Sequence, residues 1–377
     1  MDSNNTTSGE PSILIDPQES MSSMYYNLFA VLLFLTWMFG SFFNGSALLI
    51  FTKNKHLRTP TNMFVIGLAI NDFCMSSVAL FAASASYNQG WYHGDTVCAM
   101  EGFLVYVLGL TDLYLLCAIS FDRYIVIAKP LSASKINHGV ALLAIVGCWL
   151  GGTFWSVVPF FGWNYYHLEL SNVSCGVSFE GNDPSIQSYL LSIFIFCFLL
   201  PLGLIIFSYN GVYQTVRNVA RSGVWDMTSR VARKNLRVEK KMAKTIAVMI
   251  LVFLIAWLPY TIVSFYQAFL APEYIPLIVT GLPPVFAKCS AALNPIAYIG
   301  TNKQFRMAFY ELMPEGMKKT MIKREEDAMR SSSDSDDNKK TARKPTQVAP
   351  AAVDDGASQG EKTAVEDISP PQSQAVA

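Results

Sequence analysis

A single charged residue, Lys288, stands inside a long apolar stretch near the end of the chain. It is the only charge between Glu273 and Lys303, within the segment PVFAKCSAALNPIAY. Leu277 and Ile299, near the two ends of the apolar stretch, each lie eleven residues from it. Along a helix this separation is about 16 Å, farther than a lysine side chain reaches. A charge at such depth is costly and by default functional, so Lys288 must be paired, neutral or used covalently.

The amine of a buried lysine offers one distinctive reaction. In its neutral form it is a nucleophile that condenses with an aldehyde to give a Schiff base. The alternative is an ordinary ionic contact between Lys288 and an acidic ligand. Both uses require helices that surround the amine and keep it away from lipid, so the remainder of the chain must provide them.

Seven apolar stretches are each long enough, at about 20 residues, to cross a membrane. Only 15% of the 377 residues are charged and 52% are hydrophobic, whereas soluble domains carry about 25% charged residues. Alternating ten-residue strands, which a transmembrane barrel requires, do not occur in the sequence. The sequence therefore predicts an all-α bundle of seven transmembrane helices. The spans run over residues 27–52, 62–87, 97–121, 140–161, 187–210, 243–269 and 277–300.

Basic residues are restricted to alternate loops. No Lys or Arg occurs before Lys53 or within residues 88–96, 162–186 and 270–276, whereas the segment from Arg217 to Lys244 is rich in both. Because positively charged loops stay in the cytoplasm, the pattern predicts an extracellular N-terminus and a cytoplasmic C-terminus in a multi-pass membrane protein. The formal net charge is zero, which argues against a nucleic-acid partner.

Two of the seven cysteines, Cys98 and Cys175, lie at or beyond the outer ends of spans, where oxidation is favoured. We expect them to form a disulfide that ties the third span to the loop after the fourth. Asn4 and Asn5 begin glycosylation acceptor motifs in the extracellular segment 1–25. Asn172-Val173-Ser174 is a further acceptor motif, although its closeness to Cys175 can hinder the enzyme.

Several motifs at the inner side of the bundle predict a switching device. Phe121-Asp122-Arg123-Tyr124 ends the third span, and Glu239, before the sixth span, is placed to pair with Arg123 and clamp the two helices together. Simple interfacial anchoring is the alternative for such a charged pair. Pro259, beside Trp257, and Pro295, within Asn294-Pro295-Ile296-Ala297-Tyr298, predict kinks in the sixth and seventh spans.

Taken in order, these motifs resemble the rhodopsin-like G-protein-coupled receptor superfamily over about residues 26–314. Lys288, six residues before Asn294, is similar to the retinal-attachment lysine of animal opsins. The resemblance implies 11-cis-retinal held as a protonated Schiff base, isomerised by light to all-trans, and signalling through a heterotrimeric G protein in the plasma membrane of photoreceptor cells. Further residues that carry the resemblance are Asn44, Leu68-Ala69-Ile70-Asn71-Asp72, Trp149, Pro201 and Tyr209.

The resemblance also implies roles for residues around Lys288. Two acids occupy positions that opsins use to balance the Schiff-base charge: Glu101, three residues after Cys98, and Glu169, six residues before Cys175. We favour Glu101 because it lies within the bundle; Glu169 is the alternative counterion, or else a solvated loop charge. The residues implied to line the chromophore pocket are Trp257, Tyr260, Phe179 and Gly109, and those implied to turn into the cytoplasmic cleft are Tyr209 and Tyr298.

The cytoplasmic end carries the expected partners. An amphipathic helix is expected over about 302–314, and its Asn302-Lys303-Gln304 is similar to ciliary-type opsins, which favours a Gi/o or transducin-like G protein and leaves Gs open. The segment 315–377 has few large apolar residues and is expected to be disordered. Phosphorylation there by a receptor kinase would create an anionic patch for arrestin. The candidate phosphorylation sites are Ser331, Ser332, Ser333 and Ser335.

Two other functions fit the same fold: a receptor for a diffusible chemical ligand, and a retinal photoisomerase that takes all-trans-retinal. The second has no need of Arg123, Glu239 or Asn294-Pro295, which are all present. We expect a receptor without enzymatic activity and without a metal site.

Overall fold

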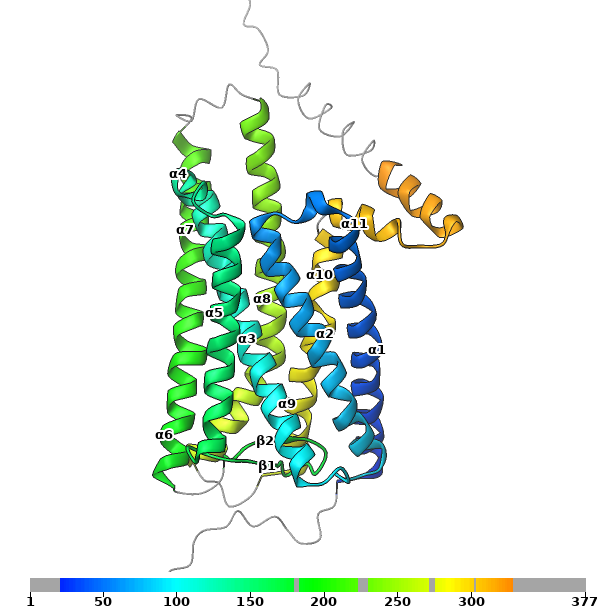
Figure 1. The fold of residues 1–377 in the computed structure, drawn as a ribbon, viewed down its shortest axis with the longest axis vertical. Helices are drawn as coiled ribbons and strands as arrows, with labels where there is room; N and C mark the ends of the chain where they lie inside the picture. The colour runs from blue at the N-terminus through cyan, green and yellow to red at the C-terminus, as the bar shows by residue number, and fades with distance from the viewer. Residues whose placement is uncertain (1–20, 180–182, 223–229, 271–274, 302, 328–377) are drawn as a thin grey trace, which may run out of the picture. The chain divides into compact units, whose positions relative to one another are not determined.

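Seven long helices run side by side in a computed structural model of the chain (Figure 1). The structure describes residues 21–179, 183–222, 230–270, 275–301 and 303–327. Each of the seven helices in this part of the chain that are long and apolar enough to cross a membrane contains one predicted span, which confirms the all-α seven-helix fold. These helices are Ser23–Lys53, Pro60–Tyr87, Asp95–Ala128, His138–Phe161, Pro184–Asn218, Glu239–Leu270 and Leu277–Gly300.

The first three spans are single helices, whereas three of the last four combine several elements. The single helices are α1 (Ser23–Lys53), α2 (Pro60–Tyr87) and α3 (Asp95–Ala128). The fourth span joins α5 (His138–Val157) to η2 (Val158–Phe161), and the fifth joins α6 (Pro184–Ile193), the π-helical segment η3 (Phe194–Leu199) and α7 (Leu200–Ser222). The sixth is α8 (Arg230–Leu270), and the seventh comprises α9 (Leu277–Cys289), η4 (Ser290–Ala292) and α10 (Asn294–Thr301). Two short loop elements are η1 (Lys55–Leu57) and α4 (Pro130–Ala133).

Four spans begin at a polar residue whose side chain caps the helix. Ser22, Thr59, Asn137 and Asp183 each accept a hydrogen bond from a backbone N–H two or three residues further on. Such caps satisfy donors that the first helical turn leaves unpaired. The loop sequences between the apolar runs therefore fix where these four spans start.

Helix α3 holds the bundle together. It contacts α2, α5, α7 and α8 as well as both strands of the loop hairpin. Its residues Leu115, Leu116 and Ile119 are fully buried in the largest apolar cluster. On the outside of the bundle large apolar side chains such as Leu143 and Ile255 are exposed, as expected for a surface that faces lipid.

The loop after the fourth span forms a small β-hairpin, which the sequence analysis did not predict. Strand β1 (Tyr166–Leu168) pairs antiparallel with β2 (Cys175–Val177), so that Leu168 faces Cys175. Both strands contact α3. The hairpin lies across the end of the bundle where α3 begins (Figure 1). It brings loop residues into the interior, beside the third and seventh spans.

The seventh span is followed by α11 (Lys303–Tyr310), within the segment expected to form an amphipathic helix. Phe305 and Phe309 of this helix are buried, and the Phe305 ring lies 5.4 Å from that of Phe51 in α1. The helical domain extends to Ile322, and a second unit starts at Lys323. Residues 315–327 are helical, whereas disorder was expected from residue 315 onward. Residues 328–377 lie outside the described part of the chain.

Candidate functional site

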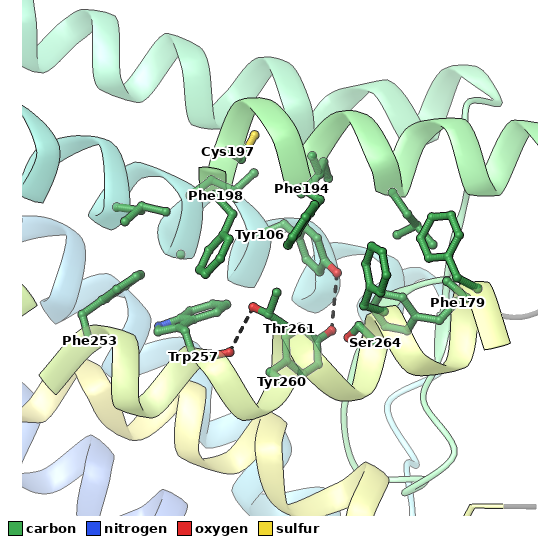
Figure 2. Close-up of a pocket in the computed structure, with 18 residues that line it drawn as sticks. Tyr106, Phe179, Phe194, Cys197, Phe198, Phe253, Trp257, Tyr260, Thr261 and Ser264 are labelled. Carbon is green, nitrogen blue, oxygen red and sulfur yellow. Dashed lines mark hydrogen bonds between the residues drawn. The ribbon is translucent and has the colours of Figure 1, made fainter. Parts of the chain in front are cut away.

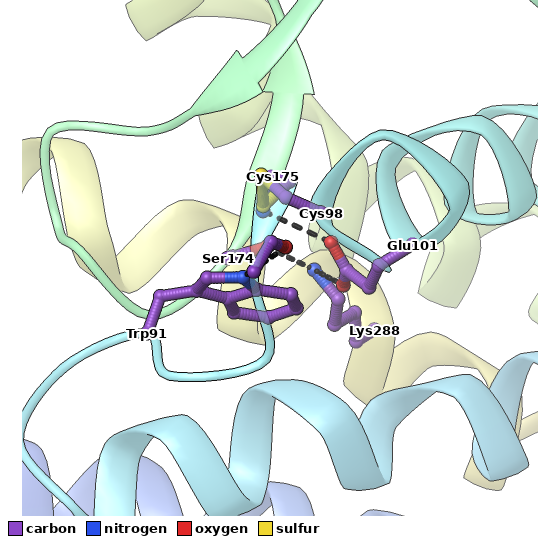
Figure 3. Close-up of a disulfide and its surroundings, with 7 residues drawn as sticks. Trp91, Cys98, Glu101, Ser174, Cys175 and Lys288 are labelled. Carbon is purple, nitrogen blue, oxygen red and sulfur yellow. Dashed lines mark hydrogen bonds and ion pairs between the residues drawn. A yellow bond between two sulfur atoms is a disulfide. The ribbon is translucent and has the colours of Figure 1, made fainter. Parts of the chain in front are cut away.

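Lys288 lies in the last turn of α9 with its amine directed into the interior of the bundle. Only 2% of its side chain is exposed. The Nζ atom donates a hydrogen bond of 2.6 Å to Ser174 Oγ and lies 3.3 Å from Glu101 Oε1 (Figure 3). The charge in the middle of the seventh span is therefore paired with a carboxylate and does not face lipid.

Glu101 comes from the second turn of α3 and is held from two sides. One carboxylate oxygen faces the lysine, and the other, Oε2, accepts a hydrogen bond of 2.9 Å from the backbone N–H of Cys175. Cys98, one helical turn earlier, forms the predicted disulfide with Cys175, which is thereby confirmed. Because this bond fixes β2 beside α3, it places both the N–H of Cys175 and the preceding Ser174 at the ion pair (Figure 3).

The second candidate acid, Glu169, lies just after β1 and is not a solvated loop charge. Its Oε1 accepts a hydrogen bond of 3.0 Å from the Tyr260 hydroxyl, and its Oε2 is shielded from solvent. Burial is the main cause that raises the pKa of Glu169 to about 7. The positive charge of Lys288 acts in the opposite direction, and the negative charge of Glu101 adds a smaller increase.

An apolar cavity lies between α3, the fifth span and α8 (Figure 2). Its lining is almost entirely apolar and aromatic, as is common in small-molecule sites. The four residues predicted to line the pocket, Gly109, Phe179, Trp257 and Tyr260, all line this cavity. Other lining residues include Tyr106, Phe194, Cys197, Phe198, Phe253 and Phe265.

Gly109 is needed for the position of Trp257. A Cβ atom built on Gly109 would lie 2.7 Å from Trp257 Cζ2, closer than real contacts allow. The indole ring is stacked on Phe253 and donates a hydrogen bond of 3.1 Å to Ser290 Oγ. Ser290 is two residues after Lys288, at the start of η4, so one aromatic side chain connects the cavity with the span that carries the amine.

The arrangement combines three properties that suit a hydrophobic aldehyde. The cavity offers an apolar, aromatic lining, Lys288 offers a buried amine, and Glu101 offers an anion for the cation that condensation produces. Lys288 does not line the cavity, and its amine lies at Glu101 and Ser174. Tyr260 does line the cavity and donates a hydrogen bond to Glu169.

The charged motif at the inner end of α3 pairs as the sequence suggested. Arg123 is buried, and its guanidinium contacts the carboxylates of Asp122, at 2.6 Å, and of Glu239 on α8. Thr61 of α2 also accepts a hydrogen bond from Arg123 and donates one of 3.0 Å to Asp122. The network joins α2, α3 and α8, while the adjacent Tyr124 ring packs against Gly211.

The remaining motif residues connect the seventh and fifth spans to their neighbours. Asn294 donates a hydrogen bond of 3.1 Å to Asp72, and the Tyr298 hydroxyl donates one of 3.3 Å to Asn62. The Tyr209 hydroxyl donates to the carbonyl of residue 243 on α8 at 3.1 Å. Pro295 follows Asn294 directly after the interruption of the helix at η4, where a kink was predicted.

Two polar residues of this interior were not found by sequence reasoning. Ser174 appeared only as part of a glycosylation motif, although its hydroxyl contacts Lys288. Asp112 is buried in the middle of α3, accepts a hydrogen bond of 2.7 Å from Asn71 and lies within hydrogen-bonding reach of Asp72. The rule that made Lys288 conspicuous, a charge within a span, applies equally to Asp112.

The modification sites predicted near the two ends of the chain lie outside the described residues. They are the acceptors Asn4 and Asn5 and the tail residues Ser331, Ser332, Ser333 and Ser335. The same holds for Asn302, the first residue of the motif used to predict the class of G protein.

A bundle of seven helices with a buried ion pair and these end motifs defines a class of membrane receptor. The chain belongs to the 7 transmembrane receptor (rhodopsin family), whose model matches residues 43–298. Melanopsin of Mus musculus is 36% identical over 304 residues, which cover 77% of this chain and 57% of melanopsin. Rhodopsin of Alloteuthis subulata is 34% identical over 303 residues, which cover 78% of this chain and 69% of that rhodopsin.

Among solved structures, the crystal structure of squid rhodopsin is similar, with a TM-score of 0.74 and 29% identity over 82% of this chain and 95% of that chain. The curated relatives are longer than the part matched: the chain spans 57% of melanopsin and 69% of the Alloteuthis rhodopsin. These similarities confirm the resemblance to animal opsins.

Proposed function

We propose that the protein is a light-activated receptor that holds 11-cis-retinal on Lys288 and activates a heterotrimeric G protein. The observation that carries the proposal is the buried ion pair of Lys288 and Glu101, in a bundle that also contains an apolar, aromatic cavity. Similarity to melanopsin and to rhodopsins supports it.

When bound as a protonated Schiff base, formed with loss of water, retinal supplies absorption of visible light and a change of shape to all-trans. The residues around Lys288 would hold the positive charge on its nitrogen. Glu101 is the proposed counterion because it already contacts that atom, and Ser174 accepts a hydrogen bond from it. Glu169 is the alternative counterion, and its bond to Tyr260 keeps it beside the cavity.

We propose that Trp257 transmits the change toward the cytoplasmic side. Its ring presses on Gly109 and stacks on Phe253, so a displacement of the ring would bias α8 about Pro259. Release of the contact between Arg123 and Glu239 would then let the inner end of α8 move outward. The groove so opened would accept the C-terminal helix of a G-protein α-subunit, as an amphipathic helix binds in a groove.

Sequence motifs suggest the cytoplasmic partners. We propose that the receptor activates a Gi/o or transducin-like G protein, as Lys303 and its neighbours suggest. We also propose that a receptor kinase phosphorylates the serines of the tail and that arrestin then binds them. We place the receptor in the plasma membrane of photoreceptor cells, with its N-terminus extracellular and its C-terminus cytoplasmic.

Reconstitution with 11-cis-retinal tests the proposal. The purified protein should gain a visible band in the dark, which Lys288→Ala abolishes and Lys303→Ala, a matched change of an exposed lysine, preserves. Borohydride adds hydride and a proton across the C=N bond, so peptide mapping after reduction should locate the label on Lys288. Absence of both band and label would favour a receptor for a diffusible ligand. A label without light-dependent nucleotide exchange on a G protein would favour a photoisomerase.

A further inference from the structure

The tip of the hairpin presents one exposed side chain amide. Asn172 is exposed and adopts a left-handed backbone conformation, with φ of 59°. Its backbone N–H donates a hydrogen bond of 2.9 Å to the backbone carbonyl of Glu169. The next two residues, Val173 and Ser174, are buried. A Cβ atom on Gly90 would lie 3.4 Å from the side-chain nitrogen of Asn172, at an ordinary van der Waals distance, so the loop around Gly90 lies near that nitrogen.

We propose that Asn172 carries an N-linked glycan that is attached before the hairpin folds. Residues 172–174 match the acceptor pattern Asn-X-Ser, with valine and not proline in the middle. The amide nitrogen of Asn172 displaces the diphosphate of a lipid-linked oligosaccharide and loses one proton, without any change of oxidation state. In the folded chain the side chain of Asn172 is exposed at the tip of the hairpin.

Folding of the hairpin removes the motif from reach. The transferase must approach both the asparagine and the hydroxyl residue, yet the Ser174 hydroxyl is buried and accepts a hydrogen bond from Lys288. Val173 packs into the same apolar cluster as Phe29 and Leu277. The glycan must therefore be added while residues 172–174 are still extended, before Cys98 and Cys175 join.

The transferase and the disulfide thus compete for the same short segment. Cys175 directly follows Ser174, so closure of the disulfide buries the hydroxyl that the transferase needs. A fraction of the chains should escape modification for this reason. Preventing the disulfide should raise the fraction that is modified.

The proposal requires only that the loop 162–186 faces the lumen during synthesis, and it is independent of any chromophore. The test uses the full chain expressed in animal cells and treated with peptide N-glycosidase F. With Asn4→Gln and Asn5→Gln in place, one enzyme-sensitive shift in mobility should remain. Asn172→Gln and Ser174→Ala should both abolish that shift, whereas Ser174→Thr, which keeps the hydroxyl, should retain it.

Peptide mapping of the unaltered chain makes the test independent of whether any variant folds. Enzymatic removal of the glycan converts asparagine to aspartate, which should be found at residue 172. If residue 172 is recovered only as asparagine while Asn4 or Asn5 is converted, the glycan proposal is overturned and the predicted orientation of the chain stands. If Asn4, Asn5 and Asn172 are all recovered as asparagine, both the glycan proposal and the predicted orientation are overturned.

The competition is tested by Cys98→Ser. Occupancy of Asn172 should rise in this variant, because the segment stays accessible for longer. Equal or lower occupancy would overturn the inference that folding and modification compete. Pigment formation with retinal is a separate readout, so its failure would bear on the photoreceptor proposal and not on the glycan.

Discussion

Replacement of Glu101 by glutamine removes the charge that faces Lys288 while keeping the shape of the side chain. At 3.3 Å and an effective dielectric constant of about 20, two opposite unit charges attract by about 5 kcal/mol. Both side chains are almost fully buried, so screening by solvent takes away little of this energy. A loss of about 5 kcal/mol corresponds to a change of more than about a thousandfold in the equilibrium between the charged and neutral nitrogen.

The assay is the absorption spectrum of the retinal-reconstituted protein in the dark over a series of pH values. Glu101→Gln should lose most of its visible band to the near ultraviolet at neutral pH, because the nitrogen gives up its proton. Glu169→Gln is the matched control and should keep the band, since Glu169 contacts the Tyr260 hydroxyl in place of the amine. The assignment of Glu101 is refuted if its variant keeps the wild-type band across the series, or if only Glu169→Gln loses it.

Three further predictions concern other parts of the molecule. Glu239→Gln removes a partly exposed ion pair worth up to about 1 kcal/mol, so dark nucleotide exchange should rise up to about fivefold, and the exposed neighbour variant Lys241→Gln should leave it unchanged. Gly109→Ala should lower pigment yield, because its methyl group collides with the indole ring described above, whereas Gly147→Ala, with nothing within 4 Å, should not. Glu169 binds its proton more tightly in the folded protein, so stability should fall by up to about 3 kcal/mol as pH rises from 4.5 to about 7, and thermal denaturation of Glu169→Gln should not show this slope.

The seven spans, the disulfide and the ion pair could be predicted because each follows from a rule that applies to few residues at once. The length of an apolar run defines a span, and the position of Cys98 and Cys175 beyond the spans defines an oxidised pair. The cost of a charge away from water made Lys288 conspicuous, and the resemblance to opsins then implied Glu101 as its counterion. None of these inferences needs the detailed packing of the helices.

The hairpin and the role of Ser174 could not be obtained in this way. Strands of three residues are too short to show a period, and β1 and β2 are held by the disulfide and by their contact with α3. The hydroxyl of Ser174 reaches Lys288 only because the loop folds inward, 114 residues away in the sequence. Asp112 differs: its type and depth were visible in the sequence, and only its partners required the structure.

The π-helical segment of the fifth span has a consequence for how such a protein can diversify. Phe194–Leu199 contributes Phe194, Cys197 and Phe198 to the cavity wall, and a π-turn holds one residue more than an α-turn. Deleting one residue there would restore a continuous α-helix and leave the two halves of the span in nearly the same rotation, because the wider turn absorbs the extra residue. Insertions and deletions at this position can therefore exchange the side chains that line the cavity while Tyr209 and the inner half of the span keep their orientation.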